Sequence, residues 1–258
     1  FFNGITNTMK SVQDSILQRR SIRRYEREPI TEDELTLIYD AIRSTPTSYN
    51  GQQFSVVDVS DPELKLKLYS VIGQKQVKTC SHFLLFIIDY HKISLMAEAI
   101  GEDMPPFYET MDGVMVGAID ASLAMMNALT MAESLGLGCC PIGYARTVSP
   151  EAVAQLLGLP PHTFVICGLT IGVPRELPDI KPKQPADIVV FKDRYDQDDA
   201  RIVSRLKEYD AEIREYNATR EGTKTDNDWA SHIISYYREG MNYNLLRALQ
   251  RRGLDAKR

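Results

Sequence analysis

One long apolar segment, residues 109–135, constrains the fold more than any other feature of this chain. It consists mainly of Ala, Gly, Met, Leu, Ile and Val, and a helix that is apolar on all sides must be buried in a core or in a subunit interface. Two shorter runs, residues 82–90 and 163–171, are nearly all apolar, as in strands that are covered on both faces. The segments together predict a sheet between layers of helices. The methionines of the long segment suit core packing or an adaptable dimer interface: Met111, Met115, Met125, Met126 and Met131.

The N-terminal half contains further local signals. Residues 11–18 have helical spacing and lead into a basic turn. Thr31 and Glu34 match a capping box at the start of a second helix, and residues 54–59 form a β-branched run of strand length. Residues 174–185 hold four prolines, which predicts an irregular but ordered connection.

The C-terminal part is predicted to be mainly helical. A short strand is expected at 188–191, followed by charged helices with a polar break at 221–228. The order of elements predicts an α+β fold, with a central mixed or antiparallel sheet flanked by helices. We expect one domain over residues 11–258, in which 200–258 form a C-terminal helical extension. Residues 1–10 are expected to be an arm or an expression remnant.

Composition argues against several kinds of partner. The formal net charge is −5 and no long basic run occurs, so neither nucleic acid nor an anionic membrane surface is expected as a partner. A signal peptide and a continuous apolar stretch of about 18 residues are not recognisable, which predicts no export and no membrane insertion. The cysteines show no CxxC or paired spacing, which favours a reducing cytoplasm: Cys80, Cys139, Cys140 and Cys167.

A basic cluster and a polar loop are the candidate binding elements. Arg19, Arg20 and Arg23 lie within five residues, together with Ser21, and arginine forks match phosphate oxygens. The same cluster also fits a solvated helix end that complements the helix dipole. The loop offers hydroxyl and amide groups that suit a flat polar ring or an ordinary turn: Thr47, Ser48, Tyr49, Asn50, Gly51, Gln52 and Gln53. Two further cations, Lys181 and Lys183, lie in the proline-rich connection.

These elements, in this order and spacing, resemble the nitroreductase family. Residues 19–25 (RRSIRRY) match the family's opening pattern, and residues 46–52 (PTSYNGQ) match its second pattern. The resemblance continues through 73–75 (GQK), 132–143 (AESLGLGCCPIG) and 178–185 (PDIKPKQP), and so covers most of the chain. The later stretches resemble the branch of oxygen-insensitive NADPH nitroreductases and flavin reductases.

The resemblance implies a homodimer with FMN bound at its interface. It implies that Arg23 lies near the polar edge of the flavin ring and Gln74 at its pyrimidine side. The resemblance also implies that Ile142 and Gly143 lie against the flavin, with the Gly143 N–H directed at the reactive nitrogen. It places a group of cations and a hydroxyl at the FMN phosphate: Arg19, Arg20, Ser21, Lys181 and Lys183. It places polar groups, contributed by the partner subunit, at the ring or ribityl chain: Thr47, Ser48, Asn50 and Gln52.

The absence of a GxGxxG motif after a strand predicts that the nicotinamide has no Rossmann site of its own. NADPH or NADH therefore visits the flavin face and leaves before a small-molecule acceptor enters, in ping-pong turnover without a protein general base. The resemblance implies nitroaromatics, quinones or free flavin as acceptors. No metal-site spacing and no GxSxG nucleophile elbow are present, and Cys139 and Cys140 lie in an apolar context that favours burial over reactivity.

Three residues bear on specificity. Tyr144 stands where that branch often has glycine, and Tyr49 stands at a variable or small position, so both are candidates for substrate contact. Arg220 is the counterpart of arginines that grip the 2′-phosphate of NADPH. These departures leave other functions open: a reductase or dehalogenase of one specific metabolite, a flavin-binding protein without significant turnover, or an anion-binding interaction module.

Overall fold

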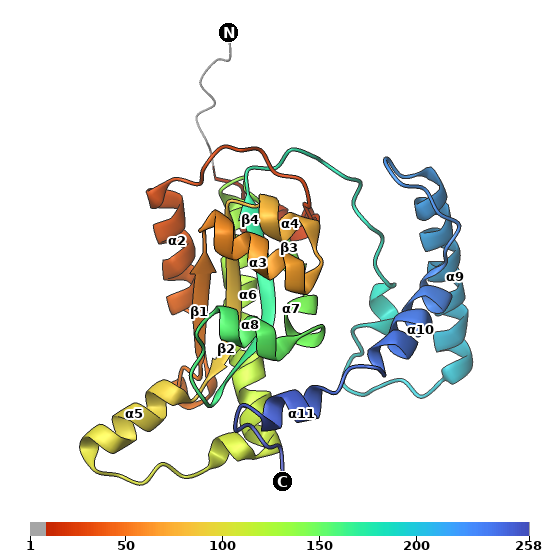
Figure 1. Ribbon diagram of the computed structural model, residues 1–258. Coiled ribbons are helices and arrows are strands. Elements are labelled where there is room, and N and C mark those ends of the chain that lie inside the picture. The colour runs from red at the N-terminus through yellow and green to blue at the C-terminus, as the bar shows by residue number, and fades with distance from the viewer. Residues whose placement is uncertain (1–8, 258) are drawn as a thin grey trace. The chain divides into compact units, whose positions relative to one another are not determined.

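The computed structural model describes residues 9–257 (Figure 1). The arm expected at residues 1–10 therefore lies largely outside the described residues. The chain divides into two compact units, the first formed by Phe1–Leu177 with Asn244–Arg258 and the second by Pro178–Tyr243. The second unit thus begins before the extension expected at 200–258, and the last residues of the chain belong to the first unit. Each unit is described by itself below.

The first unit is built on a four-stranded antiparallel sheet with the order β1-β2-β4-β3. Its strands are β1 (Phe54–Val59), β2 (His82–Asp89), β3 (Gly138–Ile142) and β4 (Thr163–Gly172). The register pairs Phe54 with Ile88 and His82 with Ile171, and Gly138 with Gly172. The two apolar runs predicted to be buried strands, now β2 and β4, form the centre of the sheet, and the predicted α+β class is confirmed.

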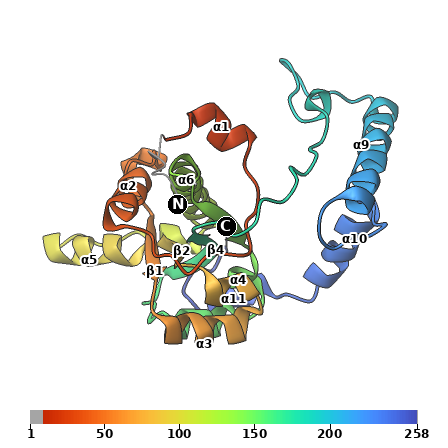
Figure 2. The ribbon, with the colours of Figure 1, turned by 90° about the horizontal axis from the view of Figure 1, so that it is seen from above.

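Helices cover both faces of this sheet (Figure 2). One face carries α2 (Glu32–Arg43) and α6 (Met111–Ser134), with α1 (Val12–Leu17) packed on α6. The other face carries α3 (Pro62–Ile72), α4 (Lys75–Thr79), α7 (Tyr144–Thr147) and α8 (Pro150–Leu156). The remaining elements of this unit are η1 (Ser48–Asn50), α5 (His91–Ile100), η2 (Phe107–Glu109) and α11 (Leu245–Gln250).

Local sequence accounts for the ends of several helices. The predicted capping box is present, since the Thr31 hydroxyl accepts a hydrogen bond from Glu34 N and the Glu34 carboxylate accepts one from Thr31 N. Asp61 caps α3, which has Pro62 at its first position, where the missing proline N–H costs no helical hydrogen bond.

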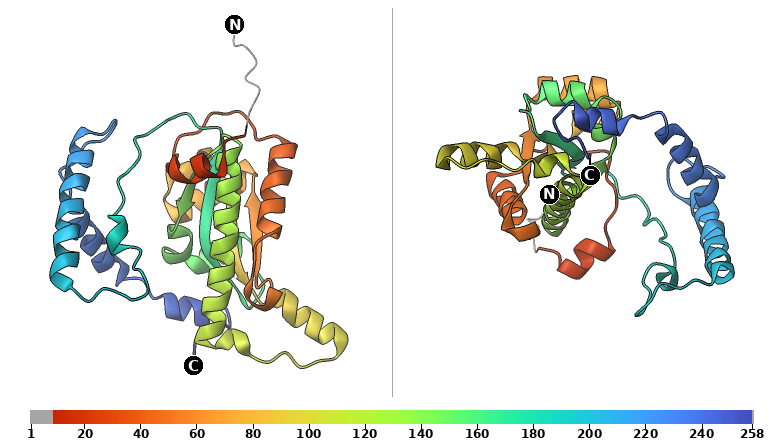
Figure 3. Two further views of the ribbon diagram at one scale, coloured as in Figure 1. Left: turned by 180° about the vertical axis from the view of Figure 1, so that it is seen from behind. Right: turned by 90° about the horizontal axis from the view of Figure 1, so that it is seen from below.

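The long helix α6 lies along one face of the sheet (Figure 3, lime green), and only its inner face is buried. Small residues face the sheet, and a Cβ added at Gly117 would lie 2.6 Å from an Ile88 methyl carbon. The large side chains on the outer face are exposed: Met111, Met115, Ile119, Leu123 and Met126. The expectation of burial in a core or in a subunit interface is therefore met within this chain on the inner face only, because small residues let the helix approach the sheet closely and leave the large ones outside. By length and composition alone α6 also qualifies as a membrane-span candidate, but its inner face packs on the sheet, as in a core helix.

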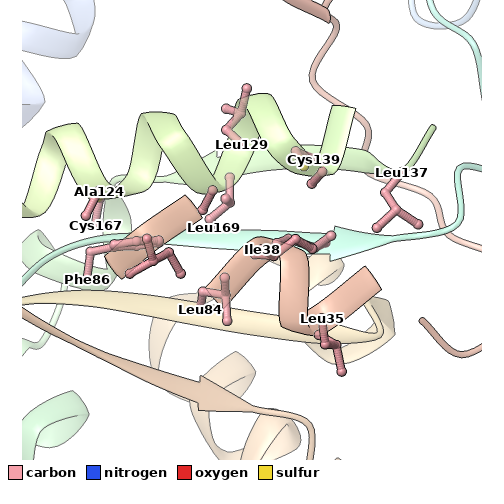
Figure 4. Close-up of a cluster of buried hydrophobic side chains, with 14 of the residues drawn as sticks. Leu35, Ile38, Leu84, Phe86, Ala124, Leu129, Leu137, Cys139, Cys167 and Leu169 are labelled. Atoms are coloured by element: carbon pink, nitrogen blue, oxygen red, sulfur yellow. The ribbon is translucent and has the colours of Figure 1, made fainter. Parts of the chain in front are cut away.

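Alternation along β2 explains why the strand is apolar at nearly every position. Leu84 and Phe86 pack on the α2 and α6 side (Figure 4), whereas Phe83 and Leu85 pack on the α3 and α8 side. Successive side chains of a strand point to opposite faces, so a strand between two helical layers needs apolar residues at both odd and even positions. The expectation of a central, doubly covered sheet is confirmed.

The second unit consists of η3 (Ala186–Ile188), α9 (Asp199–Thr219) and α10 (Trp229–Gly240). The strand expected at 188–191 is wrong. Val190 N donates instead to Ala186 O at 2.8 Å, so the segment closes local turns, and no strand is assigned within the described residues of this unit. Asp187 in this turn forms ion pairs with Arg201 and Arg205 of α9.

Candidate functional site

The basic cluster lies along the β3 edge of the sheet. After α1 the chain forms an isolated bridge between Ser21 and Cys139, and Ile22 N donates to Cys139 O at 2.9 Å. The buried Tyr25 anchors the other end of the segment, with its hydroxyl 2.8 Å from Thr170 Oγ1. The predicted charged turn is therefore held in an extended conformation against the sheet rather than left as a loose helix end.

Two arginines of this cluster have buried nitrogens with no hydrogen-bond partner among the described residues. These atoms are Arg19 Nη1 and Arg20 Nε. Leaving a buried charged donor unpaired costs several times more than leaving a neutral one unpaired, so such donors indicate a missing anionic partner. Phosphate oxygens accept bidentate hydrogen bonds from guanidinium groups. The residues present therefore fit the phosphate of FMN, which the resemblance implies.

A pocket of about 550 Å³ adjoins the cluster and brings two predicted flavin contacts together, Arg23 and Gln74. Its lining includes several cations and no acidic residue, which suits an electron-rich or anionic ligand. The other lining residues are Arg24, Tyr25, Gly73, Lys75, Gln76, Thr79 and Arg175.

Sequence reasoning missed Gln76 in this pocket. Its side chain is buried, and Nε2 donates to Gln74 Oε1 at 3.3 Å and lies 3.9 Å from Cys140 Sγ. Gln76 thus holds the predicted pyrimidine contact Gln74 in place. A glutamine inside a short helix carries no pattern that would identify this role.

Ile142 and Gly143 lie where β3 ends. Ile142 is buried and pairs with Gly168, and Gly143 is the N-cap residue of α7. The Gly143 backbone has φ −69° and ψ −31°, which any residue adopts, and a Cβ built there meets nothing within 4 Å. Neither backbone strain nor crowding requires glycine here, which fits a surface kept free for a flat ring. Tyr144 follows, half-buried against the α3 and α8 side of the core.

Replacing Gly143 by alanine is expected to leave the unfolding free energy of the apoprotein within about 0.5 kcal/mol of wild type. The added methyl group would contact the flavin, so we expect FMN affinity or the rate of flavin reduction to fall at least about tenfold. Thermal unfolding of the apoprotein and stopped-flow reduction by NADPH measure the two effects. Gly240→Ala is the matched control, because a Cβ there also meets nothing within 4 Å. Wild-type affinity and reduction in Gly143→Ala contradict the assignment.

The polar loop with Thr47, Ser48, Asn50 and Gln52 lies elsewhere, just before β1 at the opposite edge of the sheet. Three of its residues have positive φ without being glycine, namely Tyr49, Asn50 and Gln52. Such conformations cost of order 1–3 kcal/mol each and persist only where the surroundings impose them. The loop also borders a separate hollow of about 820 Å³, which Gln52 helps to line.

Asp120 of α6 holds this loop in place and was missed by sequence reasoning. This buried carboxylate accepts hydrogen bonds from Ser48 N at 3.2 Å and Gln53 N at 3.4 Å. Burial raises the Asp120 pKa, and the two backbone donors partly offset that rise. An acid within an apolar helix was the available signal, because such a group needs partners when buried.

One chain does not bring the two predicted parts of the site together. The loop is anchored at Asp120, whereas the electrostatic neighbours of Glu133, on the same helix, include Arg19 and Arg20. Thirteen residues of helix separate positions 120 and 133, which corresponds to about 20 Å at 1.5 Å per residue. The loop also contributes no residue to the pocket that Arg23 and Gln74 line.

Three predicted site residues belong to the second unit. Lys181 and Lys183 are exposed, and their segment is held by hydrogen bonds from Tyr209 Oη to Pro182 O and from Tyr216 Oη to Asp179 O. Arg220 ends α9, and its Nε donates to Thr223 O at 2.9 Å. Their roles at a flavin stay predictions.

The four cysteines are free and buried. Burial raises the pKa of Cys139 well above its usual value and raises that of Cys140 as well, so both thiols stay protonated and unreactive near neutral pH. Within residues 9–257, no group of three His, Cys, Asp or Glu side chains is arranged to hold a metal ion.

The fold and the phosphate-compatible arginines together define a cofactor-binding α+β protein. Residues 16–173 match the model of the nitroreductase family, and residues 181–257 match the model of that family's C-terminal domain. The chain belongs to the nitroreductase family.

Named relatives agree with this membership. An FMN reductase of Bacillus subtilis strain 168 that uses NAD(P)H is 34% identical over 97% of this chain and 100% of its own. The structure of a hypothetical oxidoreductase from Bacillus subtilis superposes with a TM-score of 0.92 at 33% identity, covering 97% of this chain and 100% of that one. The NADPH:FMN oxidoreductase of Vibrio harveyi, solved with NAD+, gives a TM-score of 0.83 at 29% identity, covering 96% and 99%.

Proposed function

We propose that this protein is an FMN-dependent oxidoreductase that uses NAD(P)H to reduce a small-molecule acceptor. The observation that carries the proposal is the pair of buried, unpartnered guanidinium nitrogens of Arg19 and Arg20 beside a cationic pocket, in a member of the nitroreductase family. The relatives named FMN reductase and NADPH:FMN oxidoreductase support FMN as the cofactor and NAD(P)H as the reductant.

When bound, FMN accepts a hydride from the reduced nicotinamide and returns it to the acceptor, so the protein supplies binding, orientation and electrostatic tuning. In this proposal Arg23 and Gln74 bind the polar edge of the ring. Ile142 would pack against it, and Gly143 would offer its backbone N–H to the reactive nitrogen. Arg19, Arg20 and Ser21 would hold the phosphate, and the phosphate roles that the family resemblance gives to Lys181 and Lys183 stay predictions.

Donor and acceptor are proposed to use the same slot in turn, because the chain has no dinucleotide fingerprint that would hold the nicotinamide separately. The resulting kinetics are ping-pong, with nitroaromatics, quinones or free flavin as acceptors. Tyr49 is 98% exposed in its strained loop. An aromatic ring held out in this way fits contact with substrate in another subunit, and it keeps a reductase or dehalogenase of one specific metabolite as the second candidate.

The protein is proposed to act as a homodimer. Five large apolar side chains lie exposed on the outer face of α6. An exposed apolar patch of this kind is typical of a surface that a partner protein covers. Within one chain, about 20 Å of helix separates the loop at Asp120 from the arginines of the proposed flavin site. In a dimer, this loop could instead contribute to the flavin site of the second copy. Thr47, Ser48, Asn50 and Gln52 would then reach the partner's flavin. Four free thiols support a reducing, cytoplasmic location.

An anaerobic titration tests the enzyme class. The purified protein is expected to be yellow and to lose its visible flavin absorbance on reduction of the cofactor when NADPH or NADH is added. Readmission of an acceptor is expected to restore the absorbance. A protein that binds FMN but is not reduced by either nicotinamide would be a flavin carrier, and one that refuses FMN would contradict the proposal.

Arg220 is expected to select NADPH. Replacing it by alanine should raise the KM for NADPH about tenfold, the loss of one charge-assisted contact to the 2′-phosphate, and should leave the KM for NADH unchanged. Steady-state kinetics with both donors measure the change. Arg194→Ala, at an exposed arginine of the second unit, is the control. Equal effects on both donors would assign Arg220 to folding rather than to selection.

A further inference from the structure

A buried carboxylate lies at the C-terminal end of α6, and the proposed chemistry does not use it. Glu133 is 6% exposed, and its Oε1 has no hydrogen-bond partner among the described residues. The segment before α1 joins the same end of the helix, because Lys10 N donates to Ser134 O at 2.9 Å. Glu133 therefore lies in the part of the molecule where Arg19 and Arg20 also have unpaired buried nitrogens.

The electrostatic neighbours of Glu133 come from the segments on either side of α1 and from β3. Lys10, Arg19 and Arg20 contribute positive charge, and Cys139 of β3 is also coupled to the carboxylate. Burial raises the pKa of Glu133 to about 7, and the three cations only partly oppose that rise. Cys139 keeps its proton because burial raises its own pKa further. Glu133 is thus the member of this cluster whose charge changes near neutral pH.

Phosphate binding would change that charge. In the empty site the ionised Glu133 carboxylate offsets part of the positive charge of Arg19 and Arg20, although the buried nitrogens of both arginines still have no hydrogen-bond partner among the described residues. A phosphate dianion on the two guanidinium groups takes over that role and repels a neighbouring carboxylate. The protonated form of Glu133 is then favoured, because a neutral carboxyl costs less to bury than a carboxylate. A neutral carboxyl is also not repelled by the phosphate.

We propose that Glu133 is a proton-linked positioning residue, ionised beside Arg19 and Arg20 in the empty site and protonated when the FMN phosphate binds. The inference rests on the proposed phosphate site. The balanced step is the binding of one FMN dianion and the transfer of one proton from solvent to a Glu133 carboxylate oxygen. FMN binding thus weakens as pH rises above about 7, because binding takes up a proton and the proton concentration falls.

Calorimetric titration of the apoprotein with FMN measures the proton directly. At about pH 8, where free phosphate is already a dianion, the binding heat is compared in two buffers of different ionisation enthalpy. Uptake of about 0.5 to 1 proton is expected for wild type and close to none for Glu133→Gln. Between about pH 7 and pH 9 the wild-type Kd should rise at least about tenfold, and that of Glu133→Gln should change little. Glu98→Gln, an exposed carboxylate of α5, should match wild type.

A second readout needs no FMN. The folded carboxyl binds its proton more tightly than the unfolded one, whose ordinary pKa is 4.5. The unfolding free energy of the wild-type apoprotein should therefore fall as pH rises from about 4.5 to about 7. Glu133→Gln should remove that part of the slope.

Several results would overturn the inference. Wild-type binding without proton uptake does so even if Glu133→Gln fails to fold. If Glu133→Gln weakened FMN binding equally at every pH, Glu133 would have only a structural role and no linkage to proton uptake. Absence of any FMN binding heat would instead remove the phosphate site itself, an outcome distinct from binding without proton uptake.

Discussion

The double substitution Arg19→Ala with Arg20→Ala is expected to weaken FMN binding by roughly 10²- to 10⁴-fold. A hydrogen bond to a charged group contributes about 1.5–3 kcal/mol, and each 1.4 kcal/mol is a tenfold change in Kd. Riboflavin lacks the phosphate, so its affinity should change little. Quenching of flavin fluorescence by the apoprotein measures both ligands.

The same variant separates binding from folding. Both arginines carry a buried nitrogen without a partner, so at a pH well below the Glu133 pKa of about 7, where that carboxyl is neutral, removing them should leave the thermal stability of the apoprotein unchanged or raised. Arg27→Ala, an exposed arginine in the same segment, is the control for charge alone and should bind FMN as wild type does. Equal losses for FMN and riboflavin, or a large loss of stability, would contradict the phosphate role.

Placing a charge on the outer face of α6 is expected to break the proposed dimer. Ile119→Asp puts a carboxylate among Met115, Leu123 and the other exposed large residues of that face. Burying an unpaired charge in an apolar interface costs several kcal/mol, so the dimer Kd should rise about a thousandfold or more. Sedimentation velocity at micromolar concentration should show a monomer. FMN binding should weaken with it, because the partner's Ser48 and Asn50 are lost from the site.

A matched change tests whether the position matters rather than the charge. Ile119 is 53% exposed, and Leu66 on α3, at the other face of the sheet, is 54% exposed. Leu66→Asp should leave the oligomeric state and FMN binding unchanged. A wild-type protein that sediments as a monomer, or an Ile119→Asp variant that stays dimeric, would contradict the α6 interface.

Much of the fold could be predicted because local pattern and long-range packing agree there. The apolar runs at β2 and β4 predicted buried strands, since only a strand covered on both faces is apolar at both parities. Thr31 and Glu34 predicted a helix start from chemistry confined to four residues. The motifs around Ser21 and Asn50 were sufficient to indicate the family, because their order and spacing lie in the chain itself.

Other elements could not be predicted because their local signals were weak or misleading. The strand β3 contains Cys139, Cys140 and Pro141, and it is held by pairing with β4 and by the bridge to Ser21, both distant in the sequence. Residues 188–191 have strand-like composition but close local turns instead. Hydrogen bonds to a distant strand made β3 a strand, and hydrogen bonds to nearby residues made 188–191 a turn. In both cases these bonds outweighed the intrinsic preference of the residues.

The sequence by itself determined the class of fold, the family and the residue types available for phosphate and flavin. Only the tertiary structure decided that the large side chains of α6 face outward, that Asp120 anchors the polar loop away from the arginines, and that Glu133 is buried beside them. The physical reason is that exposure and electrostatic environment depend on segments far apart in the chain. A helical pattern can show that a segment is apolar, but the neighbouring sheet decides which side of the helix is covered. The charged groups packed around a buried carboxyl decide whether it is ionised.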